Sequence, residues 1–116
     1  MLFVEYPKCT TCKRARAWLE ARGLEFADRH IKEERPTAAE LAKWQKMSGL
    51  PLKRFFNTSG QLYRSLGLKD RLGEMSEAEQ LALLASDGML VKRPLLILDD
   101  KVLVGFKEAE WEEILG

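Results

Sequence analysis

Short apolar runs open and close the chain, and apolar residues at helical spacing fill most of the stretch between them. Leu2–Tyr6 is a short apolar run, which predicts a buried strand. From Thr10 to Arg22 the apolar residues recur at helical spacing, and Gly23 is a typical residue to end such a helix. Residues 24–31 alternate loosely between apolar and polar and predict a second strand. Because a helix separates these strands, we expect them to pair in parallel.

The middle of the chain predicts only helices. Thr37 and Ser76 are each followed three residues later by a glutamate, which is the spacing of a capping box at the start of a helix. We expect these two helices to end at Gly49 and Gly88. Shorter helices are expected between them, at residues 50–56, 61–66 and 69–72.

The last part of the chain predicts a hairpin and a closing helix. Residues 95–98 form a continuous apolar run, as in a buried strand, and residues 102–104 are expected to pair back on it across a tight turn. Residues 107–115 have helical spacing. The order is therefore β-α-β, a helical insert at about residues 35–88, and then β-β-α. This order predicts an α/β protein with a thioredoxin-like fold in a single domain, residues 1–116.

Composition argues against several classes of function. Nineteen basic against eighteen acidic residues leave a net charge of +1, so nothing indicates direct nucleic-acid binding. No apolar run approaches the roughly 20 residues of a membrane helix, and the N-terminus lacks the segments of a signal peptide. We therefore expect a cytoplasmic protein without a membrane partner. In that compartment paired cysteines are usually catalytic, sensing or metal-bound.

Cys9 and Cys12 are the only cysteines, and they lie where the first strand gives way to the first helix. The first amides of a helix have no partner inside it, and the helix dipole places partial positive charge there. A thiolate at that position is stabilised, and its pKa can fall from about 8.5 to roughly 3.5–7.5. We expect Cys9 to be the nucleophile and the less exposed Cys12 to resolve the mixed disulfide.

Other interpretations of this motif remain open. The two cysteines could act as small buried hydrophobic residues, or they could bind zinc together with the single histidine, His30. A structural zinc site takes four ligands, and this chain offers three. Thr10 and Thr11 could donate hydroxyl hydrogen bonds, although capping the helix is the simpler role.

Three motifs together resemble the arsenate reductase/Spx family of thioredoxin-fold proteins. They are Tyr-Pro-Lys-Cys-x-x-Cys-Lys at residues 6–13, Val-Lys-Arg-Pro-Leu at 91–95 and Val-Gly-Phe at 104–106. Residues 55–60 and 84–90 look like the Spx/MgsR-like branch of that family, which contains uncharacterised members. The resemblance extends over essentially the whole chain.

The resemblance implies roles for individual residues. Cys9 matches the catalytic cysteine, and Arg93 matches an arginine near it, although a surface cation is the alternative for Arg93. Pro94 matches a proline that is cis in thioredoxin folds, and a cis bond before proline is uncommon. Lys13 falls where the reductases carry an arginine, so it could act as a weaker point charge.

The resemblance also implies that arsenate is a doubtful substrate. The reductases use three arginines around the oxyanion, because planar guanidinium groups form paired hydrogen bonds to it. Asn57 or a neighbour occupies the place of the first, and residues 104–106 contain none, so only Arg93 remains. The reductases also tend to borrow their second thiol from glutathione or glutaredoxin, whereas Cys12 supplies it here.

Three functions follow from the resemblance. The first is a thiol-disulfide oxidoreductase that has no tightly bound cofactor. Its reductant would be thioredoxin, glutaredoxin or glutathione, with glutathione as co-substrate. The second is a redox-switched regulator that binds the RNA polymerase α subunit. The third is arsenate reduction with a degenerate oxyanion site.

Overall fold

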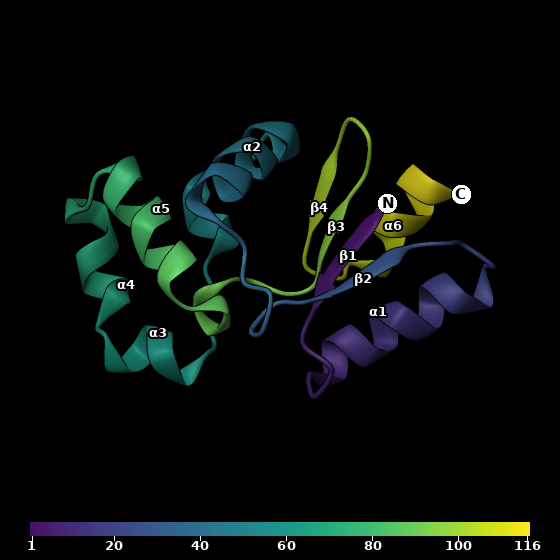
Figure 1. Cartoon of the computed structure of the whole chain (residues 1–116), viewed down its shortest axis with the longest axis horizontal. Helices are drawn as coiled ribbons and strands as arrows, with labels where there is room; N and C mark the ends of the chain where they lie inside the picture. Colours follow the sequence, from purple (N-terminus) through teal and green to yellow (C-terminus); the bar gives the residue numbers. More distant parts are fainter.

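A four-stranded sheet brings the two ends of the chain together (Figure 1). The structure is a computed structural model that describes residues 1–116. Its elements are β1 (Leu2–Glu5), α1 (Thr10–Ala21), β2 (Ala27–His30), α2 (Ala38–Ser48), η1 (Leu52–Phe55), α3 (Gln61–Ser65), α4 (Leu68–Arg71), η2 (Leu72–Glu74), α5 (Glu77–Ser86), η3 (Gly88–Leu90), β3 (Leu95–Ile97), β4 (Val102–Val104) and α6 (Glu108–Leu115).

The strand order is β2-β1-β3-β4. β1 pairs with β2 in parallel and with β3 antiparallel, and β4 pairs back on β3 antiparallel. A β-α-β unit and a β-β-α unit therefore join through β1 and β3, which confirms the expected thioredoxin-like fold. The C-terminal end of β1, the start of β3 and the C-terminal end of β4 lie at the same end of the sheet. Val4 is opposite Leu95 there, and Leu95 is opposite Val104.

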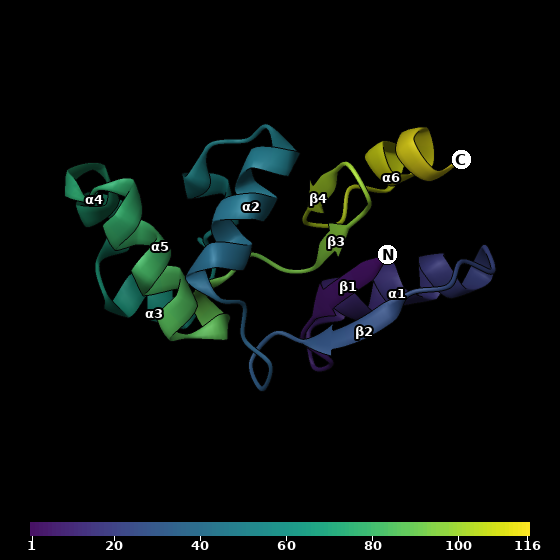
Figure 2. The same ribbon diagram turned by 45° about the horizontal axis from the view of Figure 1, so that its top comes forward.

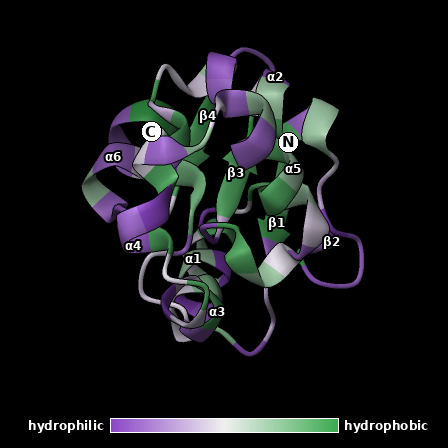
Figure 3. Cartoon of the chain, turned by 90° about the vertical axis from the view of Figure 1, so that its left-hand side faces the viewer, coloured by the Kyte–Doolittle hydropathy of each residue, from purple (hydrophilic) through white to green (hydrophobic).

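Alternating residues of the strands face two separate cores. Phe3 of β1 packs with Trp18 of α1 and Trp111 of α6 on one face of the sheet. Val4 faces the other way, into a larger core that also contains Trp44 of α2. Figure 2 shows this arrangement, with α1 and α6 on one side of the sheet and α2 on the other. β1, β3 and β4 are mainly hydrophobic, whereas β2 (Ala-Asp-Arg-His) and many outer helix turns and loops are hydrophilic (Figure 3).

The helices between β2 and β3 form an insert that shares its core with the sheet. Both capping boxes are present: the Thr37 hydroxyl accepts the Glu40 amide at 3.1 Å, and the Ser76 hydroxyl accepts the Glu79 amide at 3.1 Å. Gly88 lies directly against the backbone of Ile31, where a Cβ atom would be 1.9 Å from the Ile31 carbonyl oxygen. This contact fixes the end of the insert against the segment that follows β2.

The second strand is shorter than the sequence predicts. Leu24 does not begin β2, because its amide donates to the Leu19 carbonyl at 3.2 Å and so belongs to the turn that ends α1. Gly23 makes that turn with a φ of 66°. No helix combines the length and the apolar character that crossing a membrane would require.

Candidate active site

Cys9 is the residue that caps α1. Its backbone is extended, with φ −84° and ψ 125°, and its Sγ atom accepts the amide of Cys12 at 3.5 Å. Its own amide donates to the Tyr6 carbonyl at 2.9 Å, which closes the turn between β1 and α1. The capping role expected for Thr10 or Thr11 is therefore wrong, because a cysteine sulfur occupies the position that a hydroxyl would take. Thr10 is instead the first residue of the helix.

The two thiols have different environments. Cys9 is partly exposed, whereas Cys12 is completely buried on the inner side of α1. Burial raises the pKa of the Cys9 thiol. Hydrogen bonds from the Cys12 amide and thiol, together with the neighbouring Arg93 guanidinium, outweigh it, and the pKa of Cys9 falls below its usual value. The more exposed thiol is thus the more acidic one.

The pKa of Cys12 moves in the opposite direction. Burial is the main cause and raises it to about 12, against a hydrogen bond from the Tyr6 backbone that lowers it. The hydrogen bond with Cys9 and the negative charges of Cys9 and Glu5 raise it further. Cys12 therefore stays protonated while Cys9 ionises. The sequence assigned the same order of reactivity to these two residues.

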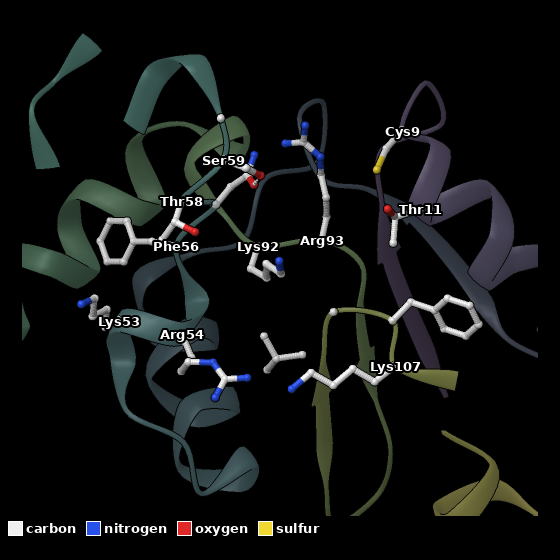
Figure 4. Close-up of a pocket in the computed structure, with 15 residues that line it drawn as sticks. Cys9, Thr11, Lys53, Arg54, Phe56, Thr58, Ser59, Lys92, Arg93 and Lys107 are labelled. Carbon is white, nitrogen blue, oxygen red and sulfur yellow. Dashed lines mark hydrogen bonds between the residues drawn. The ribbon is translucent and has the colours of Figure 1, made fainter. Parts of the chain in front are cut away.

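Arg93, the residue before Pro94, lies beside Cys9 (Figure 4). The Arg93–Pro94 peptide bond is cis, in agreement with the expectation from the sequence. The Pro94 carbonyl accepts the amide of Gly105 at 2.8 Å, and Gly105 has a φ of 75° that favours glycine. The Arg93 guanidinium carbon is 5.2 Å from the centre of the Tyr6 ring. These contacts direct Arg93 into the same cavity as Cys9 (Figure 4).

The insert supplies the opposite wall of that cavity through Asn57 and its neighbours. Asn57 is 8% exposed, its amide donates to the Leu90 carbonyl at 2.7 Å, and its Oδ1 atom accepts the Ser59 hydroxyl at 3.3 Å. The amide of Lys92 donates to the Phe55 carbonyl at 2.7 Å. Two long-range backbone hydrogen bonds therefore join the segment around η1 to the loop that carries Arg93.

The resulting cavity has a volume of about 600 Å³ and carries five cations. Arg54 and Lys107 extend towards one another across it, and Cys9, Thr11 and Arg93 face it from the side of α1 and β3 (Figure 4). No carboxylate lines it. Its cationic residues are Lys53, Arg54, Lys92, Arg93 and Lys107.

Arg93 is not the only arginine that lines this cavity. Arg54 also lines the cavity, and three lysines add to its charge. The sequence contained a signal for two of these residues, because Arg54 directly precedes the Phe55–Asn57 motif and Lys107 directly follows Phe106. The sequence comparison considered only the positions where the family's reductases carry arginine, and it therefore missed both residues.

Two other residues considered from the sequence lie elsewhere. Lys13 is exposed on α1 and does not line the cavity. The Nδ1 atom of His30 accepts the amides of Lys32 and Glu33 at 3.2 and 3.1 Å, and its ring packs edge-on against Tyr6. No three His, Cys, Asp or Glu side chains group so that they could hold a metal ion, so the structure does not gather Cys9, Cys12 and His30 into a zinc site.

This arrangement suits nucleophilic attack by sulfur. An acidic thiol opens into a cationic cavity, and a protonated thiol lies one helical turn behind it. An attacking thiolate displaces a leaving group from its target, and a second thiol can then displace the first product.

Comparison with known proteins gives the family. A sequence model of the ArsC family matches residues 4–114. The uncharacterised protein YusI of Bacillus subtilis is 56% identical, covering 97% of this chain and 96% of YusI. The regulatory protein MgsR of the same organism is 32% identical over 95% of this chain and 86% of MgsR.

A solved structure agrees with these sequence matches. A possible arsenate reductase from Streptococcus mutans superposes with a TM-score of 0.90 at 48% identity, covering 99% of this chain and 97% of that protein. The family resemblance expected from the three motifs is therefore confirmed. The chain belongs to the ArsC family.

Proposed function

We propose that this protein is a thiol-disulfide oxidoreductase that cycles Cys9 and Cys12 between dithiol and disulfide. The proposal rests on the difference in exposure and in pKa between the two thiols at the N-terminus of α1. Cys9 is partly exposed and acidic, and Cys12 is buried, protonated and in contact with Cys9 through its amide. Family membership supports thiol chemistry in general, and the specific reaction is our inference.

The reaction has two steps. The Cys9 thiolate attacks one sulfur of a disulfide R–S–S–R, which forms Cys9–S–S–R and releases R–S⁻. The Cys12 thiol then loses its proton and attacks the Cys9 sulfur, which forms the Cys9–Cys12 disulfide and releases the second R–S⁻. The substrate gains two electrons, and the protein loses two. A thiol reductant such as thioredoxin, glutaredoxin or glutathione would restore the dithiol in each cycle.

Trapping the intermediate tests this sequence. With hydroxyethyl disulfide as substrate, a Cys12→Ser variant should stop at the mixed disulfide on Cys9, which mass spectrometry detects as one added mercaptoethanol unit. The wild-type protein should instead lose two hydrogens and carry no adduct. A Cys9→Ser variant should do neither at neutral pH. Adducts on Cys12 in place of Cys9 would contradict the proposal.

Turnover is a separate requirement for an oxidoreductase. The wild-type protein should reduce the disulfide repeatedly when thioredoxin, glutaredoxin or glutathione is supplied with its NADPH-linked regenerating enzyme. Formation of one internal disulfide without turnover by any of these reductants would favour a switch over an enzyme.

A redox-switched regulator is the second candidate, and the similarity to the regulatory protein MgsR favours it. In this case oxidation of Cys9 and Cys12 would change the affinity for a protein partner, for which we propose the RNA polymerase α subunit. Immobilised α subunit should then retain only one redox state of the protein. The Cys9→Ser/Cys12→Ser variant should behave like the reduced form under oxidising conditions.

Arsenate reduction is the third candidate, and the additional arginine in the cavity favours it more than the sequence did. Arg93 lies beside Cys9, and Arg54 adds positive charge to the same cavity, which favours the entry of an oxyanion. Arsenate-dependent consumption of NADPH, lost in Cys9→Ser and reduced in Arg54→Ala, is the result that this candidate requires.

A further inference from the structure

The residues that line the cavity carry much more net positive charge than the protein as a whole. The whole chain has a net charge of +1, yet five cations and no carboxylate line this single cavity. Outside the cavity, three arginines pair with acids: Arg16 with Asp28, Arg22 with Glu112, and Arg29 with Glu40. None of the five cavity cations forms a salt bridge, although the sequence has eighteen acidic residues.

Such a cluster repels itself and is not explained by the packing of the fold. Like charges that face one cavity repel one another and raise the free energy of the folded protein, and a bound anion relieves this repulsion. Three separate segments contribute to the cluster: η1, the loop before Pro94 and the residue that precedes α6. Two backbone hydrogen bonds, from Lys92 to Phe55 and from Gly105 to Pro94, hold these segments together.

The dimensions of the cavity indicate a ligand larger than a single oxyanion. About 600 Å³ is within the range of sites that enclose drug-sized molecules. Arg93 lies beside Cys9, whereas Arg54 and Lys107 face one another in a different part of the cavity (Figure 4). Neutral polar groups of Thr11, Asn57 and Ser59 complete its walls. A ligand that reached from the sulfur of Cys9 to Arg54 and Lys107 would place separate anionic groups beside separate cations.

We infer that the substrate is a low-molecular-weight disulfide with at least one anionic group on the half that becomes bonded to Cys9. This inference rests on the proposed thiol chemistry and adds the selectivity of the site. The balanced step is the one already written: Cys9–S⁻ attacks R–S–S–R, and the half that stays as Cys9–S–S–R occupies the cavity while R–S⁻ leaves. The cations bind the charged part of that half and also favour the thiolate that attacks it.

Three small disulfides of similar length test this selectivity: 3,3′-dithiodipropionate, hydroxyethyl disulfide and cystamine, which are anionic, neutral and cationic. The measurement is the rate constant for mixed-disulfide formation by the Cys12→Ser variant, divided by that of a free cysteine derivative with the same disulfide. The division removes differences in leaving-group reactivity. We expect the anionic disulfide to exceed the neutral one by about tenfold at low salt, with cystamine slowest. Most of the difference should disappear at about 1 M salt.

Charge reversal locates the effect in the cavity. Arg54→Glu and Lys107→Glu should abolish or invert the preference, whereas Lys43→Glu, an exposed change of equal charge on α2, should leave it intact. Iodoacetamide, which is neutral, should still alkylate Cys9 in all three variants, which shows that the thiol remains accessible. Equal normalised rates for the three disulfides, or equal effects of Arg54→Glu and Lys43→Glu, would overturn the inference. Rapid reaction with hydroxyethyl disulfide would in that case leave the proposed function standing.

A second pair of substrates distinguishes a carboxylate from a phosphate as the anionic group that the cavity binds. Oxidised glutathione carries carboxylates, and coenzyme A disulfide carries phosphates. If oxidised glutathione gives the larger normalised rate, and this rate falls in Lys107→Glu or Arg54→Glu, the cavity binds carboxylates. If coenzyme A disulfide gives the larger normalised rate, and this rate falls in the same variants, the cavity binds phosphates. Insensitivity of both substrates to both variants would contradict the inference.

Discussion

The amide of Cys12 donates to the sulfur of Cys9 at 3.5 Å, so the second residue of the redox pair stabilises the first before any reaction occurs. The same helical turn that brings this amide to Cys9 buries the Cys12 side chain against the sheet. One local structure therefore lowers the pKa of one thiol and raises the pKa of the other. The division of labour between nucleophile and resolving thiol follows from it.

Replacing Arg93 should make Cys9 less acidic. The Arg93 guanidinium is among the groups that lower the pKa of Cys9, so Arg93→Ala should raise that pKa and slow alkylation of Cys9 at pH 7 several-fold. The rate should recover at a pH high enough to ionise the thiol. Lys13→Ala removes a charge outside the cavity and should have a smaller effect. An identical loss in both variants would mean that only the overall charge matters.

Arg93→Lys separates charge from shape. A lysine keeps the positive charge but lacks the planar fork of the guanidinium. We expect it to restore the alkylation rate of Cys9 in large part. If Arg93→Lys were as slow as Arg93→Ala, the orientation of the guanidinium would be the dominant factor.

Glu5→Gln should make Cys12 more acidic. Glu5 ends β1, is only 2% exposed and makes no side-chain hydrogen bond or salt bridge within the protein. Its charge is one of the smaller causes of the raised pKa of Cys12, after burial. In a Cys9→Ser background, thiolate absorbance near 240 nm should therefore rise at lower pH when Glu5 is glutamine. An unchanged titration would show that the charge of Glu5 does not contribute to the raised pKa of Cys12.

The same substitution should change stability with a defined pH dependence. Burial, followed by the Asp28 carboxylate, raises the pKa of Glu5 above 4.5, while Arg16 and His30 oppose this shift. As pH rises, Glu5 loses its proton at a lower pH in the unfolded chain than in the folded protein. The folded protein therefore loses stability as pH rises from 4.5 through the folded pKa. Glu5→Gln should be more stable than the wild type at pH 8 and lose this advantage below pH 4.5 in urea unfolding. A variant less stable than the wild type at pH 8 would contradict this reasoning.

Gly88→Ala should destabilise the fold by at least about 2 kcal/mol, because its Cβ atom would lie 1.9 Å from the Ile31 carbonyl oxygen. Gly73→Ala is the matched control, since nothing lies within 4 Å of a Cβ atom there. Urea unfolding measures both. Similar free energies of unfolding for the two variants would show that the insert can move away from β2.

Local features of the sequence were sufficient to predict most of the fold. Capping boxes at Thr37 and Ser76, and the apolar run of β3, specify their elements through contacts within a few residues. The start of β2 could not be predicted, because the Leu24 amide completes the turn of the preceding helix. Apolar character alone does not distinguish these two uses of a leucine.

The candidate site divides in the same way. Cys9 and Cys12 are one helical turn apart, so their spacing and position already indicated their relationship. Arg54 and Lys107 are distant in sequence and face one another only because the insert packs beside β4. Their convergence depends on tertiary structure. A motif-by-motif comparison therefore underestimated the charge of the cavity.

The most direct test of this account is the rate of alkylation of each cysteine as a function of pH in the wild-type protein. Brief iodoacetamide pulses, followed by mass spectrometry of the labelled peptides, resolve the two thiols. We predict that labelling of Cys9 titrates with a midpoint clearly below the ordinary thiol value of about 8.5, while Cys12 remains unlabelled at that pH. Two thiols that titrate together near 8.5, or Cys12 reacting first, would contradict the assignment of Cys9 as the activated nucleophile.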